Sequence, residues 1–316
     1  MNVPSLVAAI DIGGTKIAGA LVDPAGAISR YFVADTRATR PADEVMAAVA
    51  QVVDAVSSGP EWERVAAVGI GSAGPVDISR GSVSPVNIAA WRDFPLVERV
   101  RALPAVGGRP IVLGGDGVAL AAAEHWLGAA QPYANALCMT VSTGVGGGLI
   151  LGGEVYPGPT GNAGHIGHLS VAVDGDPCPC GGRGCVETMA SGPAIARRAI
   201  SEGWQPPQGD RSAKAAAEAA QAGDPAALAA FDRAARALAA GVAATAALVE
   251  IDAVVVGGGV AKAGDLLLDP LRRHLKEYAA LPFTSSLVVV PAQQGTDAGL
   301  IGAAHLARAA LGSAAA

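Results

Sequence analysis

The pattern that most constrains the fold of this chain is a buried strand followed by a glycine-rich turn, and it occurs once in each half. In the first half, Asp11-Ile12-Gly13-Gly14-Thr15-Lys16 lies between the apolar strands Leu6–Ile10 and Ile17–Val22. In the second half, Ser142–Gly148 follows the apolar strand Ala136–Val141. Strands joined by short glycine turns form β-hairpins. Each half is therefore predicted to contain a hairpin.

Helices and further strands follow both hairpins. Pro41–Ser58 has valines at helical spacing on one face. Asp224-Pro225 has a capping residue and then proline at the first helical position, which predicts a helix start. Asp297 is predicted to open the last helix. The other expected strands are Ala27–Val33, Val65–Ile70, Ile111–Leu113, Gly147–Leu151, Ala253–Val256 and Leu287–Val290, and the other helices are Gly117–Leu127 and Ser191–Ser201.

This order of elements predicts a mixed α/β protein with two similar halves and a cleft between them. We place the boundary near Gly114-Gly115, with an N-terminal α/β domain over residues 1–115 and a C-terminal α/β domain over 116–296. The C-terminal helix 297–316 is expected to complete the first domain. The chain shows no long linker and no sequence repeat.

Composition excludes several classes of function. Hydrophobic residues make up 51% of the 316 residues and charged residues only 16%, which is enough apolar material for two cores. The net charge is −6 and Lys and Arg are not clustered, so we expect no nucleic-acid partner. Charges or glycines interrupt the apolar stretches before a membrane span of about 18 residues is reached. Met1–Ile10 lacks the basic start of a signal peptide, so we expect a cytoplasmic protein.

One histidine and three cysteines have the spacing of a metal site. His168 is followed by Cys178, Cys180 and Cys185, with glycines between the last two cysteines. A Cys₃His set is typical of a closed tetrahedral Zn²⁺ site with a structural role. A disulfide and unpaired thiols remain the alternatives. In a reducing compartment this spacing favours the metal. The fourth cysteine, Cys138, lies in an apolar strand and is expected to be a buried free thiol.

The first hairpin carries groups suited to phosphate. Gly13 and Gly14 leave backbone N–H groups accessible to an anion, Thr15 adds a hydroxyl and Lys16 adds a positive charge. Asp11 has the chemistry to hold a water bound to Mg²⁺. An ordinary glycine turn is the alternative interpretation.

The second hairpin is richer in glycine and has no charge. Thr143, Gly144 and Gly146 are its candidate nucleotide contacts, and Gly257 and Gly258 form a third glycine run after a strand. No helix follows Ser142–Gly148, as a dinucleotide fingerprint would require, and no Gly-Lys dipeptide of a Walker A motif occurs. One hairpin in each half could hold one side of a triphosphate.

Three further residues are candidates for substrate chemistry. Asp116 follows a strand and precedes a helix, so it is either a helix N-cap or a general base toward a substrate hydroxyl. His165 precedes His168 by three residues, and Glu187 follows Cys185 by two. A metal knot would fix both of these residues, while a surface histidine and a solvated glutamate are the alternatives.

Together these motifs resemble the ROK family of bacterial repressors, open-reading-frame proteins and sugar kinases. The hairpin at Asp11–Lys16, the loop Thr143–Gly148, the Cys₃His knot with Glu187, Gly257–Gly259 and Asp297-Ala298-Gly299 stand in the family's order. The resemblance implies a two-domain actin-like ATPase (ribonuclease H-like) fold with a cleft between domains. It also implies transfer of the γ-phosphate of MgATP to the 6-hydroxyl of a hexose.

The resemblance assigns roles to particular residues. Asp116 is the base that accepts the proton of the sugar hydroxyl, and Asn87, His165, His168 and Glu187 contact the sugar. The family's repressors carry an N-terminal DNA-binding segment; because the hairpin begins at Asp11 and the chain is acidic, we expect a kinase rather than a repressor. The family also implies a homodimer, with a tetramer as the alternative.

Two positions depart from the family pattern. Gly115 stands where an asparagine usually precedes the base, and His165 stands where a glutamate is usual. N-acetylmannosamine kinases of the family share that histidine, whereas Asn87–Trp91 resembles actinobacterial glucokinases. We therefore expect glucose as the sugar, with N-acetylmannosamine kinase or a catalytically weak sugar sensor as alternatives. The donor is expected to be ATP, with polyphosphate as its alternative.

Overall fold

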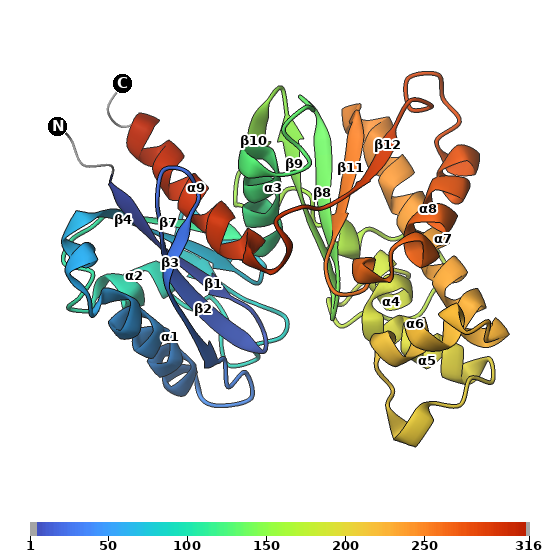
Figure 1. Ribbon diagram of the computed structural model, residues 1–316, viewed down its shortest axis with the longest axis horizontal. Helices are drawn as coiled ribbons and strands as arrows, with labels where there is room; N and C mark the ends of the chain where they lie inside the picture. Colours follow the sequence, from blue (N-terminus) through green and yellow to red (C-terminus); the bar gives the residue numbers. More distant parts are fainter. Residues whose placement is uncertain (1–4, 314–316) are drawn as a thin grey trace. The chain divides into compact units, whose positions relative to one another are not determined.

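The computed structural model describes residues 5–313 (Figure 1). Residues 1–4 and 314–316, the two ends of the predicted first domain, lie outside the described residues. The chain divides into two compact units. The first unit comprises the residues up to Gly128, Val155–Ala163 and the residues from Thr296 onward, and the second comprises Ala129–Glu154 and Gly164–Gly295.

The first unit is built on a five-stranded sheet with strand order β3-β2-β1-β4-β7. Its strands are β1 Leu6–Ile12, β2 Lys16–Val22, β3 Ile28–Asp35, β4 Val65–Ser72 and β7 Ile111–Gly115. β1, β2 and β3 pair antiparallel, whereas β1, β4 and β7 pair parallel. Its helices are α1 Ala42–Ser57, α2 Leu96–Arg101, α3 Asp116–Leu127 and α9 Ala298–Ser313, and a small ribbon joins β5 Val76–Asp77 to β6 Ser82–Val83.

The second unit repeats this topology in a sheet with strand order β10-β9-β8-β11-β12. Its strands are β8 Ala136–Val141, β9 Val145–Leu151, β10 Glu154–Tyr156, β11 Ala253–Gly257 and β12 Val288–Pro291. β8 and β9 pair antiparallel, and β8, β11 and β12 pair parallel. Its helices are α4 Val186–Ala190, α5 Gly192–Ser201, α6 Ala213–Gln221, α7 Pro225–Val249 and α8 Asp265–Tyr278.

The alternation of side chains along β1 builds two cores in the first unit. Ala8 and Ile10 join a cluster with the buried valines of α1. Val7 and Ala9 point to the opposite face and join a cluster with Ala303 and other residues of α9. Successive strand residues face opposite sides of a sheet, so a continuous apolar strand needs cover on both sides. This requirement brings the C-terminal helix onto the N-terminal sheet.

The predicted domain boundary at residues 115 and 116 differs from the observed division. Helix α3, which starts at Asp116, packs on α9 and belongs to the first unit, as does Val155–Ala163. Both α3 and α9 are rich in alanine, so their shared burial was not visible as a periodic pattern.

Several predicted element bounds also change. β9 begins at Val145, so the turn of the second hairpin is shorter than Ser142–Gly148, and Gly146 lies within the strand. Helix α3 begins at Asp116 itself, and Gly115 occupies the N-cap position. The predicted cap at Asp224 is confirmed, since its carboxylate accepts a hydrogen bond from the Ala227 N–H at 2.9 Å. Ser191 occupies the N-cap of α5, but its side chain makes no capping bond.

Candidate functional site

In the first unit, the turn after β1 is closed by its own backbone and by one side chain. The Gly13 N–H donates to the Lys16 carbonyl at 3.0 Å. The hydroxyl of the buried Thr36 donates to the Gly13 carbonyl at 2.7 Å. Thr36 was not predicted as a site residue, because a lone threonine after a strand carries no distinguishing pattern. The backbone of Gly14 lies so close to the side-chain amide of Asn87 that a Cβ would overlap it. The structure thus brings Asn87 to the hairpin.

Two carboxyl groups of this unit interact. Asp11 lies on β1, and Asp116 lies at the first position of α3, after the parallel strand β7. The pKa of Asp11 is raised to about 6, chiefly because burial removes its carboxyl from water, and then because of the negative charge of Asp116. Lys16 opposes the shift. Asp11 also contacts α9, where a Cβ at Gly299 would overlap its carboxyl group.

Asp116 is exposed and has a local hydrogen bond. Its Oδ1 accepts from the Gly117 N–H at 2.7 Å, so the carboxylate satisfies one of the unpaired donors at the start of α3. The alternative of Asp116 as the helix N-cap is wrong, because Gly115 holds that position. At Gly115 a Cβ would lie 3.1 Å from the Gly161 carbonyl oxygen, so a larger residue would press on that loop.

In the second unit, the loop Ser142–Gly144 is supported by several segments. The third glycine run packs beneath it, with the Val260 N–H donating to the Val141 carbonyl at 2.9 Å. Thr143 is exposed at the tip. Gly258 has a φ of 95°, a conformation that favours glycine, and its backbone lies against Val141. Gly257 is the last residue of β11. The two predicted glycine runs of this half are therefore neighbours.

The Glu187 carboxylate is tied to the same loop. Its Oε2 accepts a hydrogen bond from the Val145 N–H at 2.9 Å. Glu187 lies in α4, which begins directly after Cys185. His165 and His168 come from one turn, and their rings stack with centroids 5.8 Å apart. The structure thus places Glu187, His165 and His168 in the same unit as the loop.

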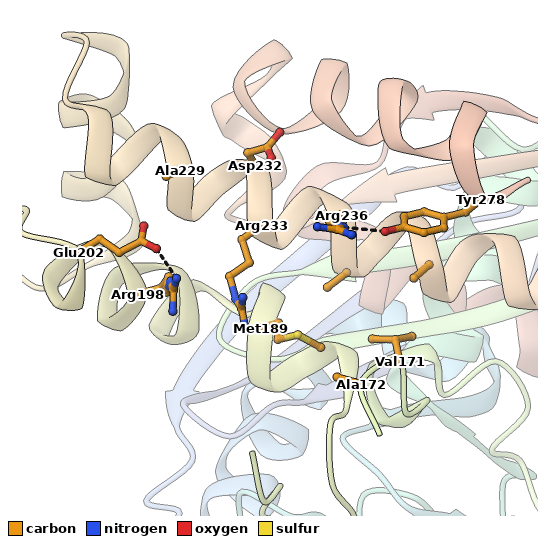
Figure 2. Close-up of a pocket in the computed structure, with 12 residues that line it drawn as sticks. Val171, Ala172, Met189, Arg198, Glu202, Ala229, Asp232, Arg233, Arg236 and Tyr278 are labelled. Carbon is orange, nitrogen blue, oxygen red and sulfur yellow. Dashed lines mark hydrogen bonds and ion pairs between the residues drawn. The ribbon is translucent and has the colours of Figure 1, made fainter. Parts of the chain in front are cut away.

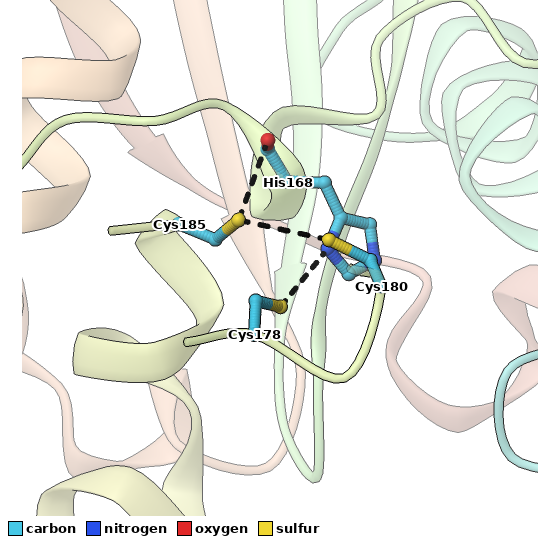
Figure 3. Close-up of side chains that lie close together, drawn as sticks. All are labelled: His168, Cys178, Cys180 and Cys185. Carbon is cyan, nitrogen blue, oxygen red and sulfur yellow. Dashed lines mark hydrogen bonds between the residues drawn. The ribbon is translucent and has the colours of Figure 1, made fainter. Parts of the chain in front are cut away.

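The predicted metal ligands converge (Figure 3). One ligand atom from each of His168, Cys178, Cys180 and Cys185 lies within 4.8 Å of every other. His168 ends the short 3₁₀ helix η2 (Ile166–His168), and Cys185 immediately precedes α4. The Cys180 and Cys185 sulfurs are 3.8 Å apart, and the Cys178 sulfur lies 3.7 Å from Nδ1 of His168.

These distances fit a tetrahedral cation and do not fit a disulfide. Thiolates bound to Zn²⁺ at about 2.3 Å in a tetrahedron stand about 3.8 Å apart, whereas disulfide sulfurs are about 2.05 Å apart. Burial raises the pKa of Cys185 to about 12, and a bound cation reverses such a shift by favouring the thiolate. The fourth cysteine, Cys138, is a buried thiol in β8, as predicted.

A separate pocket of about 420 Å³ lies elsewhere in the second unit (Figure 2). It is bordered by Met189 of α4, Arg198 of α5, Arg233 and Arg236 of α7, and Tyr278 of α8. Arg236 donates to the Tyr278 hydroxyl at 2.6 Å, and Arg198 pairs with Glu202. None of the predicted site residues is among the described residues that line it.

The fold and the comparisons define the class of protein. The chain has the two-sheet α/β fold of the actin-like, ribonuclease H-like ATPases. It superimposes on a ROK family glucokinase from Streptomyces griseus solved with glucose and AMPPNP, with a TM-score of 0.83, 38% identity and coverage of 96% of this chain and 100% of that one. The ROK family matches residues 7–310, so the chain belongs to the ROK family.

Two curated relatives differ in the sugar that they are named for. A glucokinase from Streptomyces coelicolor is 37% identical over 321 residues, covering 96% of this chain and 98% of that protein. An N-acetylmannosamine kinase from Yersinia pseudotuberculosis is 37% identical over 305 residues, with the same coverage of both chains. Among residues 5–313, no helix is long and apolar enough to cross a bilayer.

Proposed function

We propose that this protein is an ATP-dependent hexose kinase that transfers the γ-phosphate of MgATP to the 6-hydroxyl of glucose. The observation that carries the proposal is the exposed Asp116 carboxylate at the start of α3, close enough to Asp11 to raise its pKa. Membership of the ROK family and the similarity to glucokinases support it.

The residues of the chain would divide the reaction as follows. Asp116 accepts the proton of the sugar 6-hydroxyl. The oxygen of that hydroxyl forms a bond to the γ-phosphorus, and the bond from the γ-phosphorus to the bridging oxygen breaks, so that ADP leaves. Asp11 orients a water bound to Mg²⁺. Gly13, Gly14, Gly144 and Gly146 let the phosphate groups approach the two turns, whose N–H groups that are not bonded within the hairpins bind phosphate oxygens, while Thr15, Lys16 and Thr143 add side-chain donors.

The other predicted residues would bind the sugar and the nucleoside. Asn87, His165, His168 and Glu187 are the sugar contacts, and Gly257 and Gly258 lie against the nucleoside. His168 serves the metal knot through one ring nitrogen, Nδ1, which faces Cys178, and this leaves Nε2 for the substrate.

The Cys₃His knot is proposed to hold one structural Zn²⁺. The donor set and the 3.8 Å between the Cys180 and Cys185 sulfurs support this role, since four protein ligands would leave no coordination position for a substrate. We further propose that the protein acts in the cytoplasm as a homodimer, with a tetramer as the alternative.

N-acetylmannosamine is the second candidate substrate. His165 favours it, because a neutral imidazole both donates and accepts hydrogen bonds, whereas the glutamate usual at this position only accepts. The N-acetylmannosamine kinase relative is as similar to this chain as the glucokinase. Gly115, which lacks the usual amide beside the base, favours a catalytically weak sugar sensor.

A coupled assay of ADP release with a panel of hexoses tests these alternatives. The proposal expects turnover that is fastest with glucose and that requires Mg²⁺. Fastest turnover with N-acetylmannosamine would select the second candidate. A third outcome is sugar binding, measured by calorimetry, without ADP release and without turnover when polyphosphate replaces ATP. This outcome would identify a sensor and reject the kinase.

A further inference from the structure

The backbone of Val145, where the second glycine loop enters β9, is held from two sides. Its N–H donates to Oε2 of Glu187 at 2.9 Å. Its carbonyl oxygen faces Gly167 so closely that any Cβ at Gly167 would overlap it. Gly167 immediately precedes the metal ligand His168, and Glu187 follows the metal ligand Cys185 by two residues. We call the contacts of Glu187 and Gly167 with Val145 the Val145 clamp. Each of these two residues therefore lies beside a predicted metal ligand in the sequence.

The rest of the loop depends on the same segments. At Gly144 a Cβ would lie 2.6 Å from Oε2 of Glu187, so the carboxylate reaches Val145 only past a residue without a side chain. The Ser142 carbonyl accepts a hydrogen bond at 2.7 Å from the Gly192 N–H, at the start of α5. Helix α5 follows α4 directly, and α4 carries Glu187.

The covalent connection between the two sides of the clamp is irregular. Residues 169–184 join His168 to Cys185 and form no helix or regular strand, only isolated bridges such as that between Ser170 and Cys185. Backbone contacts already join its two ends, since the Val186 N–H donates to the Leu169 carbonyl at 3.0 Å beside that bridge. A cation shared by His168 and Cys185 would add a second, stiffer tie between the same ends, because metal–ligand distances and angles are narrowly defined.

We infer that the Cys₃His knot positions the nucleotide loop Ser142–Gly146 by holding Gly167 and Glu187 against Val145. This inference rests on the proposed zinc ion and on the proposed nucleotide role of the loop. Glu187 is then a positioning residue for the loop in addition to a sugar contact. The loop carries no charged side chain, so the direction of its N–H groups is its main means of binding phosphate.

Hydrogen exchange measured by mass spectrometry tests the link between the knot and the loop. After removal of the metal by a chelator, a peptide covering Ser142–Gly146 should exchange at least about tenfold faster, the factor for losing a hydrogen bond to a charged group. The matched control is the peptide covering Ile12–Lys16 of the first hairpin, which should not change. Protection of β11 must persist, which shows that the second unit remains folded. An unchanged loop beside a deprotected segment 176–186 would overturn the inference.

Two variants at Glu187 test the clamp in the metal-loaded protein, in case metal removal unfolds the second unit. Glu187→Gln keeps an oxygen that can accept from the Val145 N–H, and Glu187→Ala removes it. Glu187→Ala should speed loop exchange about tenfold and raise the Kd for MgATP, measured without sugar, by a similar factor. Glu187→Gln keeps a neutral acceptor, so both quantities should change clearly less than in Glu187→Ala. Metal content should be equal in all three proteins.

The outcomes separate this inference from the proposed function. Equal loop exchange in the alanine and glutamine variants would reject the clamp even if the protein is a kinase. Metal-dependent loop exchange in a protein that phosphorylates no sugar would reject the kinase and leave the link between knot and loop intact. A wild-type protein that binds no metal ion would overturn the inference whatever its activity.

Discussion

The two glycine hairpins occupy the same place in two sheets of the same topology, yet they are stabilised differently. The first joins β1 to β2 and the second joins β8 to β9, in each case at the antiparallel pair of a mixed sheet. The first hairpin carries its own charges in Asp11 and Lys16 and is closed by the hydroxyl of Thr36, which directly follows β3. The second has no charged residue, and Glu187 and Gly167 hold it from outside.

The difference shows how one topology can serve two kinds of phosphate contact. A hairpin with an aspartate and a lysine can bind a metal-bound water and a phosphate through side chains. A hairpin rich in glycine and without charged residues binds phosphate mainly through backbone N–H groups, with the Thr143 hydroxyl as an added donor. The direction of these N–H groups depends on the segments that support the turn. In this chain the support comes from segments next to the predicted metal ligands.

The largest effect is expected in the second unit on loss of a metal ligand. Cys180→Ser should lower the metal content and destabilise the protein by on the order of 4 kcal/mol, as losses of metal sites do. At about 2–4 °C per kcal/mol for units of this size, the Tm should fall by about 10 °C. Differential scanning calorimetry and elemental analysis measure both. Asp176→Ser, an exposed change in the same segment, is the control. A normal Tm in a metal-free variant would mean that the metal does not stabilise the second unit.

In the first unit, the largest effect on catalysis is expected at Asp116. Asp116→Asn removes the proton acceptor, so kcat should fall at least about 10²-fold, the lower end for loss of a general base. Glucose and nucleotide affinities, measured by calorimetry, should change little. An unchanged kcat would mean that Asp116 only satisfies the donors at the start of α3.

The ionised carboxylate of Asp11 is expected to lower the stability of the folded protein. Its folded pKa of about 6 lies above the ordinary 3.8, so ionising it costs folding free energy. That cost is absent below about pH 3.8 and complete above about pH 6. In urea unfolding without Mg²⁺, Asp11→Asn should therefore be more stable than wild type at pH 7.5, by at most about 3 kcal/mol at about 1.4 kcal/mol per pKa unit. The gain should vanish at pH 4.

The same pKa gives a pH profile for activity. Because the proposed role of Asp11 requires the carboxylate, kcat/KM of the wild-type enzyme should fall as the pH drops through about 6. Equal stability of wild type and Asp11→Asn at both pH values would show that the carboxyl is not desolvated.

The smallest effect is expected at His165. A charged hydrogen bond adds about 1 kcal/mol over a neutral one, so His165→Glu should favour glucose over N-acetylmannosamine by roughly fivefold to tenfold in kcat/KM. Competition assays with both sugars measure the ratio directly. If the ratio equals that of wild type, His165 does not contact the sugar, and the histidine pair serves only the knot.

Much of the local structure follows from the sequence because its causes are local. The apolar runs of β1, β8 and β11, the Asp224 cap and the valine face of α1 were all predicted from adjacent residues. The Cys₃His set was predicted from ligand type and spacing, and its four side chains do converge. The predicted start of β9 was wrong. The glycines of this segment favoured a turn, whereas pairing with β8 makes Gly146 part of the strand.

What the sequence by itself determined is the identity of the chemical groups: the ligand set of the knot, the glycines of both hairpins and the acidic residues that follow strands. Only the tertiary structure decided which groups support one another. It placed α3 against α9, Asn87 against Gly14 and Asp11 near Asp116. It also joined Glu187 and Gly167 to Val145. The physical reason is that these contacts join residues far apart in the chain, where neither periodicity nor spacing carries information, and packing on both faces of each sheet selects them.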